Sequence, residues 1–244
     1  MDFSMEKQNP VFDYDRAWAN KWEDMKKYGP VSRHTRRILT EIIMSLEFGS
    51  VLDVGCGQGS FLEELLTEFP TIRPYGIDLS SEAVKLAKLR VPKGQFWVLD
   101  IEEEYLKKTF DLVVCSEVLE HIAKDLSALK NLAHMTGKYL IISTLQGRMR
   151  SFEAHQSGHV RNYPRGELAA KIKESGFKVL RVTEWGFPFF SPLYRDFLEL
   201  TGAKGTMGKF GFLRKAVSYS LYHLFRLNSS KRGDEIFILA EQTV

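Results

Sequence analysis

Short apolar segments alternate with amphipathic segments through the middle of this chain. The apolar segments have the length of buried strands and lie at 51–54, 73–77, 95–99, 110–115 and 138–143. The segments between them carry apolar residues at helical spacing and include 61–69, 84–90 and 118–132. Strands that alternate with helices are typical of a parallel sheet with helices on both faces. The pattern therefore predicts a large α/β domain.

The last hundred residues are less regular. A polar connection at 146–164 is too long for a passive turn and predicts a functional loop or lid. Beyond it the pattern predicts a helix, a strand, an aromatic segment with two prolines, an amphipathic helix and a last strand, at 167–175, 177–183, 185–197, 212–225 and 235–240. The apolar residues of the aromatic segment and of the amphipathic helix are interpreted as ordinary packing. A pocket for an apolar ligand and a contact in the plane of a membrane surface are the alternatives.

The N-terminal region also lies outside the alternation. Residues 1–49 contain a predicted helix at 32–46 and several aromatic residues. They are interpreted as an arm packed on the sheet, or else as a lid that closes over a ligand with Arg33 or Arg36. The expected parts of the chain are this arm, a ligand-binding core, a cap insertion and the last strand of the core, at 1–49, 50–185, 186–230 and 231–244.

Composition narrows the class of protein. The 34 basic and 31 acidic residues leave a net charge of +3, which is too small to require nucleic acid as a partner. The two cysteines exclude a disulfide framework and suit a reducing cytoplasm. No stretch reaches about 18 uninterrupted apolar residues, and the N-terminus lacks the apolar core of a signal peptide. We therefore expect a soluble cytoplasmic protein, whose oligomeric state the sequence leaves open.

The segment 51–60 is the most informative stretch of the chain. An apolar strand ends in a turn with glycines at 55, 57 and 59, and a helix follows directly. Glycines in such a turn permit positive φ and let the backbone approach a nucleotide-like ligand closely. Dinucleotide-binding folds use G-x-G-x-x-G, whereas this turn is G-x-G-x-G with Asp53 before it. A carboxylate there suits a cationic ammonium group better than a pyrophosphate.

Acidic residues follow at the ends of the next predicted strands. Asp78 ends the second strand, Asp100 follows the third and Glu117 follows the fourth. Because the carboxyl ends of parallel strands share one edge of a sheet, these side chains and Asp53 could all contact one ligand. The functional groups of S-adenosylmethionine match this set: an ammonium group, two ribose hydroxyls and an adenine.

With these motifs, residues 50–145 resemble class I S-adenosylmethionine-dependent methyltransferases. The matching motifs are Val51 to Gly59, Asp78, Asp100-Ile101 and Cys115-Ser116-Glu117-Val118-Leu119-Glu120-His121. The Glu-x-Leu-Glu-His sequence resembles the small-molecule branch, which includes enzymes that methylate quinone precursors and natural products. The resemblance implies a Rossmann-like sheet of seven mostly parallel strands with an antiparallel last strand, helices on both faces, and a helical cap built from the N-terminal arm and the insertion before the last strand.

The resemblance also implies cofactor contacts. Asp53 would bind the methionine ammonium group directly or through water, and Asp78 the ribose hydroxyls. Asp100 and Ile101 would contact the adenine, with Leu79 beside the ribose-binding acid. The remaining contacts would come from the turn backbone and from the floor near the methionine moiety, at Gly55, Cys56, Gly57, Gly59, Ser116 and Glu117.

For the acceptor side the sequence leaves two interpretations open, because each candidate residue also has an ordinary structural role. The candidates for acceptor contact or catalysis are His121, His155, His159, Arg161 and Tyr163. Histidine is suited to act as a base because its unperturbed pKa lies near 6.5. The acidic residues all have assigned uses, so we expect no metal.

The predicted function is in-line transfer of a methyl group to a small, apolar or membrane-derived acceptor, with oxygen favoured over nitrogen and carbon. S-adenosylhomocysteine would be the product. Asn-Pro-Pro-Tyr and Asp-Pro-Pro-Tyr are missing after the fourth strand, which argues against nucleic-acid bases as acceptors. An NAD-dependent oxidoreductase and a non-catalytic adaptor that retains the fold are the alternatives.

Overall fold

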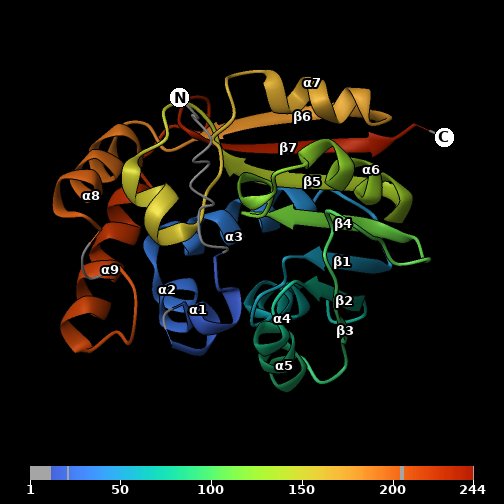
Figure 1. The fold of residues 1–244 in the computed structure, drawn as a ribbon, viewed down its shortest axis with the longest axis horizontal. Helices are drawn as coiled ribbons and strands as arrows, with labels where there is room; N and C mark the ends of the chain where they lie inside the picture. The colour runs from blue at the N-terminus through green and yellow to red at the C-terminus, as the bar shows by residue number, and fades with distance from the viewer. Residues whose placement is uncertain (1–11, 21, 204–205, 244) are drawn as a thin grey trace, which may run out of the picture.

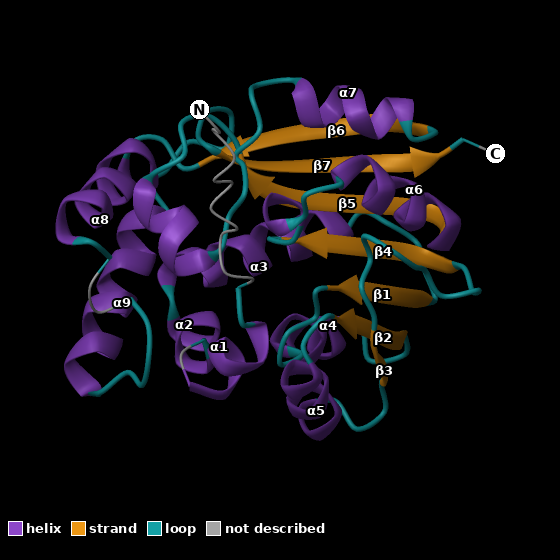
Figure 2. Cartoon of the chain, viewed as in Figure 1, coloured by secondary structure: helices purple, strands orange, loops and turns teal. Residues whose placement is uncertain are grey.

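A seven-stranded mixed sheet forms the centre of the molecule (Figures 1 and 2). The computed structural model describes residues 12–20, 22–203 and 206–243. The strands are β1 Ser50–Val54, β2 Arg73–Asp78, β3 Gln95–Val98, β4 Phe110–Ser116, β5 Thr136–Leu145, β6 Phe177–Trp185 and β7 Glu235–Gln242. Their order across the sheet is β3-β2-β1-β4-β5-β7-β6, and β7 runs antiparallel to both of its neighbours. The predicted fold class is therefore confirmed.

Helices cover both faces of this sheet and the end at which its parallel strands stop. The α-helices are α1 Tyr14–Asn20, α2 Glu23–Tyr28, α3 Pro30–Ile43, α4 Ser60–Glu68, α5 Ser81–Arg90, α6 Asp125–Met135, α7 Glu167–Glu174, α8 Arg195–Thr201 and α9 Phe212–Phe225. Short helical turns occur at η1 Leu119–His121, η2 Glu153–Ser157 and η3 Phe189–Tyr194. In Figure 1 the arrowheads of β1, β4 and β5 point toward α1, α2, α8 and α9. These four helices therefore cover the carboxyl ends of the parallel strands.

Each inner strand buries side chains on both of its faces. Val51 packs in one core cluster with residues of α3, α4 and α5, whereas Leu52 packs in the other with residues of α6 and α7. Neighbouring residues point to opposite faces because side chains alternate along a strand. Two covered faces explain why these strands are nearly continuous apolar runs in the sequence.

The predicted helix at 118–132 is wrong in its first part. The chain forms the single turn η1, passes through an extended residue at Ile122, and begins α6 only at Asp125. The Asp125 carboxylate accepts a hydrogen bond from the Tyr163 hydroxyl at 2.9 Å and pairs with Lys171 at 2.7 Å. These tertiary contacts hold the start of α6 and override the helical periodicity of the sequence. As a result Leu126, which the pattern placed on the buried face, lies at the surface.

The N-terminal arm is fixed to the core by polar contacts at both ends. Asp15 in α1 accepts hydrogen bonds from the Ser80 hydroxyl at 2.6 Å and from the Glu82 amide at 3.1 Å, at the start of α5. Arg36 in α3 donates to Glu64 of α4 at 2.8 Å and to the Lys26 carbonyl of α2 at 2.6 Å. The Arg33 guanidinium lies over the Tyr222 ring, 3.8 Å from its centroid. Arg36 thus connects the arm to the core, and Arg33 connects the arm to α9 of the insertion.

The insertion between β6 and β7 carries η3, α8 and α9. Phe225 of α9 is buried against Trp185 and Phe190. Phe212 and Leu213 at the other end of α9 are 90% and 74% exposed. The packing interpretation therefore holds for Phe225 and is wrong for the first turn of α9. Contact with a membrane surface stays an alternative interpretation of these exposed residues.

None of the helices in the described part of the chain is long and apolar enough to cross a bilayer.

The helix α6 offers a test of the packing on one face of the sheet. Leu129 is fully buried there, whereas Leu126 is 37% exposed on the same helix. Replacing Leu129 by Ala should lower the free energy of unfolding by about 2–5 kcal/mol, because it removes buried methyl groups and leaves a cavity. Urea denaturation of L129A and of the matched control L126A measures the difference. Equal losses in both variants would contradict the assigned packing.

Candidate active site

A cavity of about 720 Å³ lies where the parallel strands end. One wall consists of the glycine turn after β1 and the residues that follow β2, β3 and β4. The opposite walls come from the N-terminal arm, from the segment around η2, and from α8 and α9. Strand ends, arm and insertion therefore enclose one shared space.

The glycine turn has a backbone that a side chain would block. The amides of Gly55 and Cys56 both donate to the Ile77 carbonyl, at 2.8 and 3.0 Å. Gly55 has φ +71°, and a Cβ there would lie 2.2 Å from Cγ2 of Val118. Gly57 has φ +52°, and a Cβ there would lie 2.4 Å from the Trp18 ring. Both positions require glycine, and the turn presents its backbone to the cavity.

Asp78 connects the end of β2 to this turn. Its Oδ2 accepts a hydrogen bond from the Gly57 amide at 2.8 Å, and its Oδ1 accepts one from the Ser80 amide at 2.9 Å. Burial raises the pKa of this carboxyl, against the lowering effect of the two amides. A carboxylate offers about four acceptor sites, so each oxygen retains a lone pair for a further donor. Two ribose hydroxyls fit that remaining capacity.

Asp53 lies deeper in the same wall, one residue before the end of β1. Its side chain is buried, and burial, together with the nearby charge of Asp78, raises its pKa well above the usual range. A buried carboxylate is stabilised by a cation brought close to it. The ammonium group expected from the sequence fits this position.

The other predicted cofactor contacts also reach the cavity, with one exception. Asp100, whose Oδ1 accepts the Glu102 amide at 2.9 Å, lines it together with Ile101. Further lining residues from the same prediction are Cys56, Leu79, Ser116 and Glu117. Gly59 does not line the cavity. It precedes α4 at φ +78°, where a Cβ would lie 3.3 Å from Cα of Ala87, so its role is to let α4 and α5 approach.

Of the five acceptor-side candidates, two line the cavity. His121 and His159 face each other edge to face, with ring centroids 4.8 Å apart. Burial lowers the pKa of His121 to about 4 and that of His159 to about 3, so both rings are neutral near pH 7. A neutral imidazole with so low a pKa is a weak base.

The remaining three candidates lie outside the cavity lining. His155 is exposed, and its Nδ1 lies 2.7 Å from the Ser151 carbonyl. Arg161 pairs with Asp125 at 2.7 Å, and the Tyr163 hydroxyl donates to the same carboxylate. Arg161 and Tyr163 therefore hold the start of α6.

Sequence reasoning missed a group of buried charges beside the cavity. Arg195 of α8 is 1% exposed and binds Glu153 of η2 at 2.6 Å and Asp234 before β7 at 2.8 Å. Glu120 is fully buried, and burial, reinforced by the charge of Glu117, raises its pKa to about 8. Glu120 stood within the Glu-x-Leu-Glu-His motif, but nothing in the sequence indicated its burial. For Arg195 the sequence offered no signal.

Comparison with known proteins identifies the family. A family model described as a methyltransferase domain matches residues 22–182, more than half of the chain. A ubiquinone biosynthesis O-methyltransferase from Nitrosomonas europaea is 30% identical over 171 residues, covering 65% of this chain and 72% of that protein. The protein of the same name from Vibrio parahaemolyticus is 29% identical over 146 residues, covering 55% and 61%.

Solved structures share the fold at low sequence identity. The N-methyltransferase NodS from Bradyrhizobium japonicum, in complex with S-adenosyl-L-homocysteine, aligns with a TM-score of 0.61 at 16% identity, covering 94% of this chain and 96% of that one. Magnesium protoporphyrin IX methyltransferase from Synechocystis aligns with a TM-score of 0.58 at 16% identity, covering 86% and 83%. Both likenesses cover most of this chain.

The position of Asp78 gives a first test of the site. Replacing Asp78 by Ala should weaken S-adenosylmethionine binding about ten-fold or more, because hydrogen bonds to a charged acceptor are lost. Asp111 is the matched control, since it also accepts backbone amides, from Gly49 at 2.8 Å and Ser50 at 2.9 Å, but at the start of β4. Calorimetry should find D111A close to wild type in affinity. Unchanged affinity in D78A would exclude the ribose assignment.

A substitution at Tyr163 tests whether this residue supports the start of α6 or takes part in the reaction in the cavity. Y163F removes only the hydroxyl that donates to Asp125, so it should cost about 1 kcal/mol of unfolding free energy. Donor affinity and kcat should stay near wild type, because the ring and its packing remain. Denaturation and steady-state kinetics on the same preparation distinguish the two effects. A large fall in kcat at unchanged stability would restore Tyr163 as a catalytic residue.

Proposed function

Because the chain belongs to the methyltransferase-domain family, we propose that it transfers a methyl group from S-adenosylmethionine to an oxygen atom of a small, apolar acceptor. One observation carries this proposal. The donor wall, built from the glycine turn and the strand ends, and an apolar wall from the cap line the same cavity. A charged nucleoside and an apolar molecule can therefore meet inside it.

The donor is held by the strand-end side of the cavity. Asp78 takes the ribose hydroxyls, Asp53 the ammonium group, and Asp100 the adenine. Gly55 and Gly57 let the backbone approach the ligand, and Trp18 of the arm packs over the turn. When bound, S-adenosylmethionine supplies an already activated methyl group on a sulfonium.

The acceptor lies on the cap side. Apolar residues of α8, α9 and the segment between them line the cavity there, among them Phe197, Leu198, Phe210, Leu213 and Val217. Burying an apolar molecule against such a wall contributes about 25 cal/mol per Å² of apolar surface. The curated relatives named above are O-methyltransferases of ubiquinone biosynthesis, which supports oxygen as the accepting atom.

The protein contributes mainly alignment and exclusion of water. Holding two reactants in line converts a bimolecular step into an effectively unimolecular one. The arm closes one side of the cavity with Tyr14, Trp18 and Trp22, and the cap closes the other. The N-terminal arm therefore serves as a cover of the site, which supports the lid interpretation of its aromatic residues.

The experiment is methyl transfer from labelled S-adenosylmethionine to an extract of the source cells, separated into organic and aqueous phases. Label should enter the organic phase and survive mild alkaline hydrolysis, as methyl ethers do and methyl esters do not. Val217 of α9 lines the cavity, whereas Leu224 of the same helix does not. V217D should lower transfer about ten-fold or more, because it places a charge where the apolar acceptor binds. L224D should match wild type.

Three outcomes would contradict the proposal. Label found only in water-soluble products would exclude an apolar acceptor. Label lost on alkaline hydrolysis would point to a carboxylate acceptor. Tight binding of S-adenosylmethionine without any transfer would favour an adaptor that retains the fold.

A further inference from the structure

The segment that contains α9 has a charge unlike that of the rest of the protein. Residues 202–233 include seven lysines and arginines and no aspartate or glutamate. The remainder of the chain has 27 basic and 31 acidic residues, so the net positive charge of the protein comes from this one segment. The segment also lies beyond residue 182, where the match to the family model ends. Its charge is therefore a feature that this chain adds to the matched domain.

Most of these cations are available to a partner. Six of them are exposed and make no ion pair with a carboxylate in the described part of the chain: Lys209, Arg214, Lys215, Arg226, Lys231 and Arg232. Lys215 lies over the Tyr28 ring at 4.3 Å, and Arg232 lies over the Phe187 ring at 4.0 Å, contacts that leave both charges unneutralised. Cations gathered in one segment without acidic partners suit a negatively charged surface outside the protein.

The first half of α9 exposes apolar side chains beside these cations. Phe212 and Leu213 project from the first turn, and Val217, one turn later, is exposed as well. At about 3.6 residues per turn, these side chains form a strip with Arg214 on one side and Lys215 on the other. An apolar strip flanked by cations is typical of helices that lie in the plane of a membrane surface, where long basic side chains reach the headgroups.

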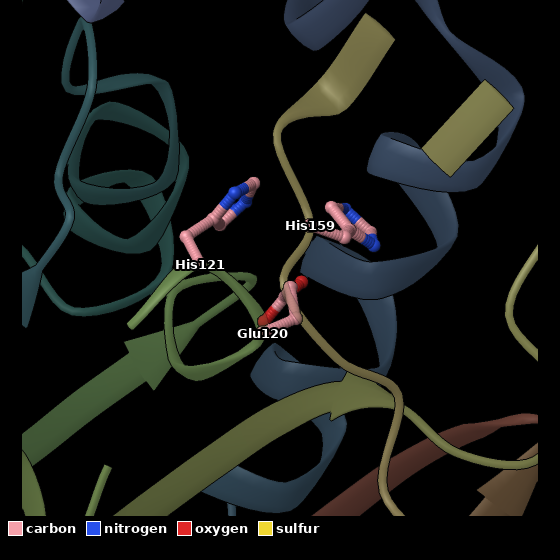
Figure 3. A group of neighbouring side chains, drawn as sticks. All are labelled: Glu120, His121 and His159. Carbon is pink, nitrogen blue, oxygen red and sulfur yellow. The ribbon is translucent and has the colours of Figure 1, made fainter. Parts of the chain in front are cut away.

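The apolar strip lies at the mouth of the cavity. Leu213 and Val217 are exposed to solvent and line the cavity as well. The same cavity reaches His121 and His159, which flank the buried Glu120 in Figure 3. In Figure 1, α8 and α9 form the left side of the molecule, beyond α1 and α2 of the arm. A path therefore leads from the exposed strip to the polar end of the site.

We propose that the first half of α9 docks in the plane of an anionic phospholipid membrane and presents the mouth of the cavity to the lipid. Phe212 and Leu213 enter the boundary between headgroups and acyl chains. Lys209, Arg214 and Lys215 contact the lipid phosphates around them. Such binding grows with the apolar surface that enters the lipid and with the number of basic residues at the headgroups.

The same observations argue against two other partners. A nucleic acid would attract the cations, but a phosphate backbone gains nothing from the aliphatic Leu213 and Val217 beside them. A second copy of this chain, docked symmetrically through the strip, would bring two sets of unpaired cations together. An anionic membrane offers negative charge and an apolar interior at the same surface, so it matches both parts of the segment.

Docking has a consequence for the substrate, and this part of the inference rests on the proposed function. An apolar acceptor dissolved in the lipid would enter beside Leu213 and Val217 without crossing water. Its apolar part would remain against the cap, and its hydroxyl would point toward the strand ends that hold the donor. The class of acceptor is therefore a lipid-soluble molecule with one polar end.

The test is flotation of the full-length protein with vesicles. Wild type should bind vesicles of equal parts phosphatidylglycerol and phosphatidylcholine about ten-fold or more tightly than pure phosphatidylcholine vesicles, and added salt should weaken this binding. F212D and K209E should each weaken it about ten-fold or more, because the first removes an apolar side chain from the lipid and the second reverses a charge at the headgroups. Neither residue lines the cavity.

Two control variants carry the same changes elsewhere. L89D places a charge on another exposed leucine, in α5. K107E reverses the charge of an exposed lysine before β4, at the opposite end of the parallel strands from the cavity. Both should bind vesicles as wild type does. K107E also has the same net charge as K209E, so it separates a local contact from an effect of total charge.

Each result has a defined meaning. Weaker vesicle binding in F212D and K209E, with both controls unchanged, supports docking. Absence of vesicle binding in the wild type, or equal binding by all variants, overturns it. Binding of single-stranded RNA but not of vesicles, weakened by K209E and unaffected by F212D, overturns it in favour of a nucleic acid. A wild-type dimer that F212D dissociates overturns it in favour of a second copy.

The affinity for S-adenosylmethionine is measured by calorimetry on the same samples without vesicles. It should be equal in wild type, F212D and K209E, because the donor wall lies away from both substitutions. A protein that binds the donor but no vesicle leaves the methyltransferase proposal intact and removes only the docking. The two failures are therefore distinguishable.

Discussion

The hydrogen bond from the Gly57 amide to the Asp78 carboxylate is the contact on which the site depends. It joins the turn after β1 to the end of β2, so the turn backbone and the carboxylate that we propose for donor binding are held in a fixed relation to each other. The Ile77 carbonyl, which accepts the amides of Gly55 and Cys56, reinforces the same connection. The two amides that donate hydrogen bonds to Asp78 offset part of the cost of burying its carboxylate, and they leave one lone pair free on each oxygen.

Much of this wall was readable from the sequence because its signals are local. A strand, a glycine turn and an acid at the next strand end are each specified by a few adjacent residues, and the parallel topology then brings them together. The η1 turn was not readable, because the helical spacing of Leu119, Ile122 and Leu126 is genuine. It is overridden by Asp125, whose partners Tyr163 and Lys171 lie about 40 residues away in sequence. Only tertiary contacts decide such a case.

The arrangement of the cap could not be predicted from the sequence, because it depends on contacts between residues that lie far apart in the chain. Arg195 joins η2, α8 and the segment before β7 through Glu153 and Asp234. Loss of either partner of such a buried ion pair would leave the other charge unpaired in a low-dielectric environment, which is strongly destabilising. The aromatic and apolar residues of the cap were evident in sequence, but their division between packing, cavity lining and surface was not. That division depends on which side of α9 faces α3, which spacing alone cannot settle.

The buried acids make the cavity less negatively charged than their number suggests. The charge of Glu117 raises the pKa values of Glu120 and Glu235 beyond the effect of burial. Burial, together with the charge of Asp78, raises the pKa of Asp53 well above its usual range. A cation that binds close to such a carboxyl group favours its ionised form. Binding of a sulfonium donor with its ammonium group and ionisation of these acids would therefore reinforce each other, and transfer of the methyl group, which leaves a neutral thioether, would remove part of that coupling.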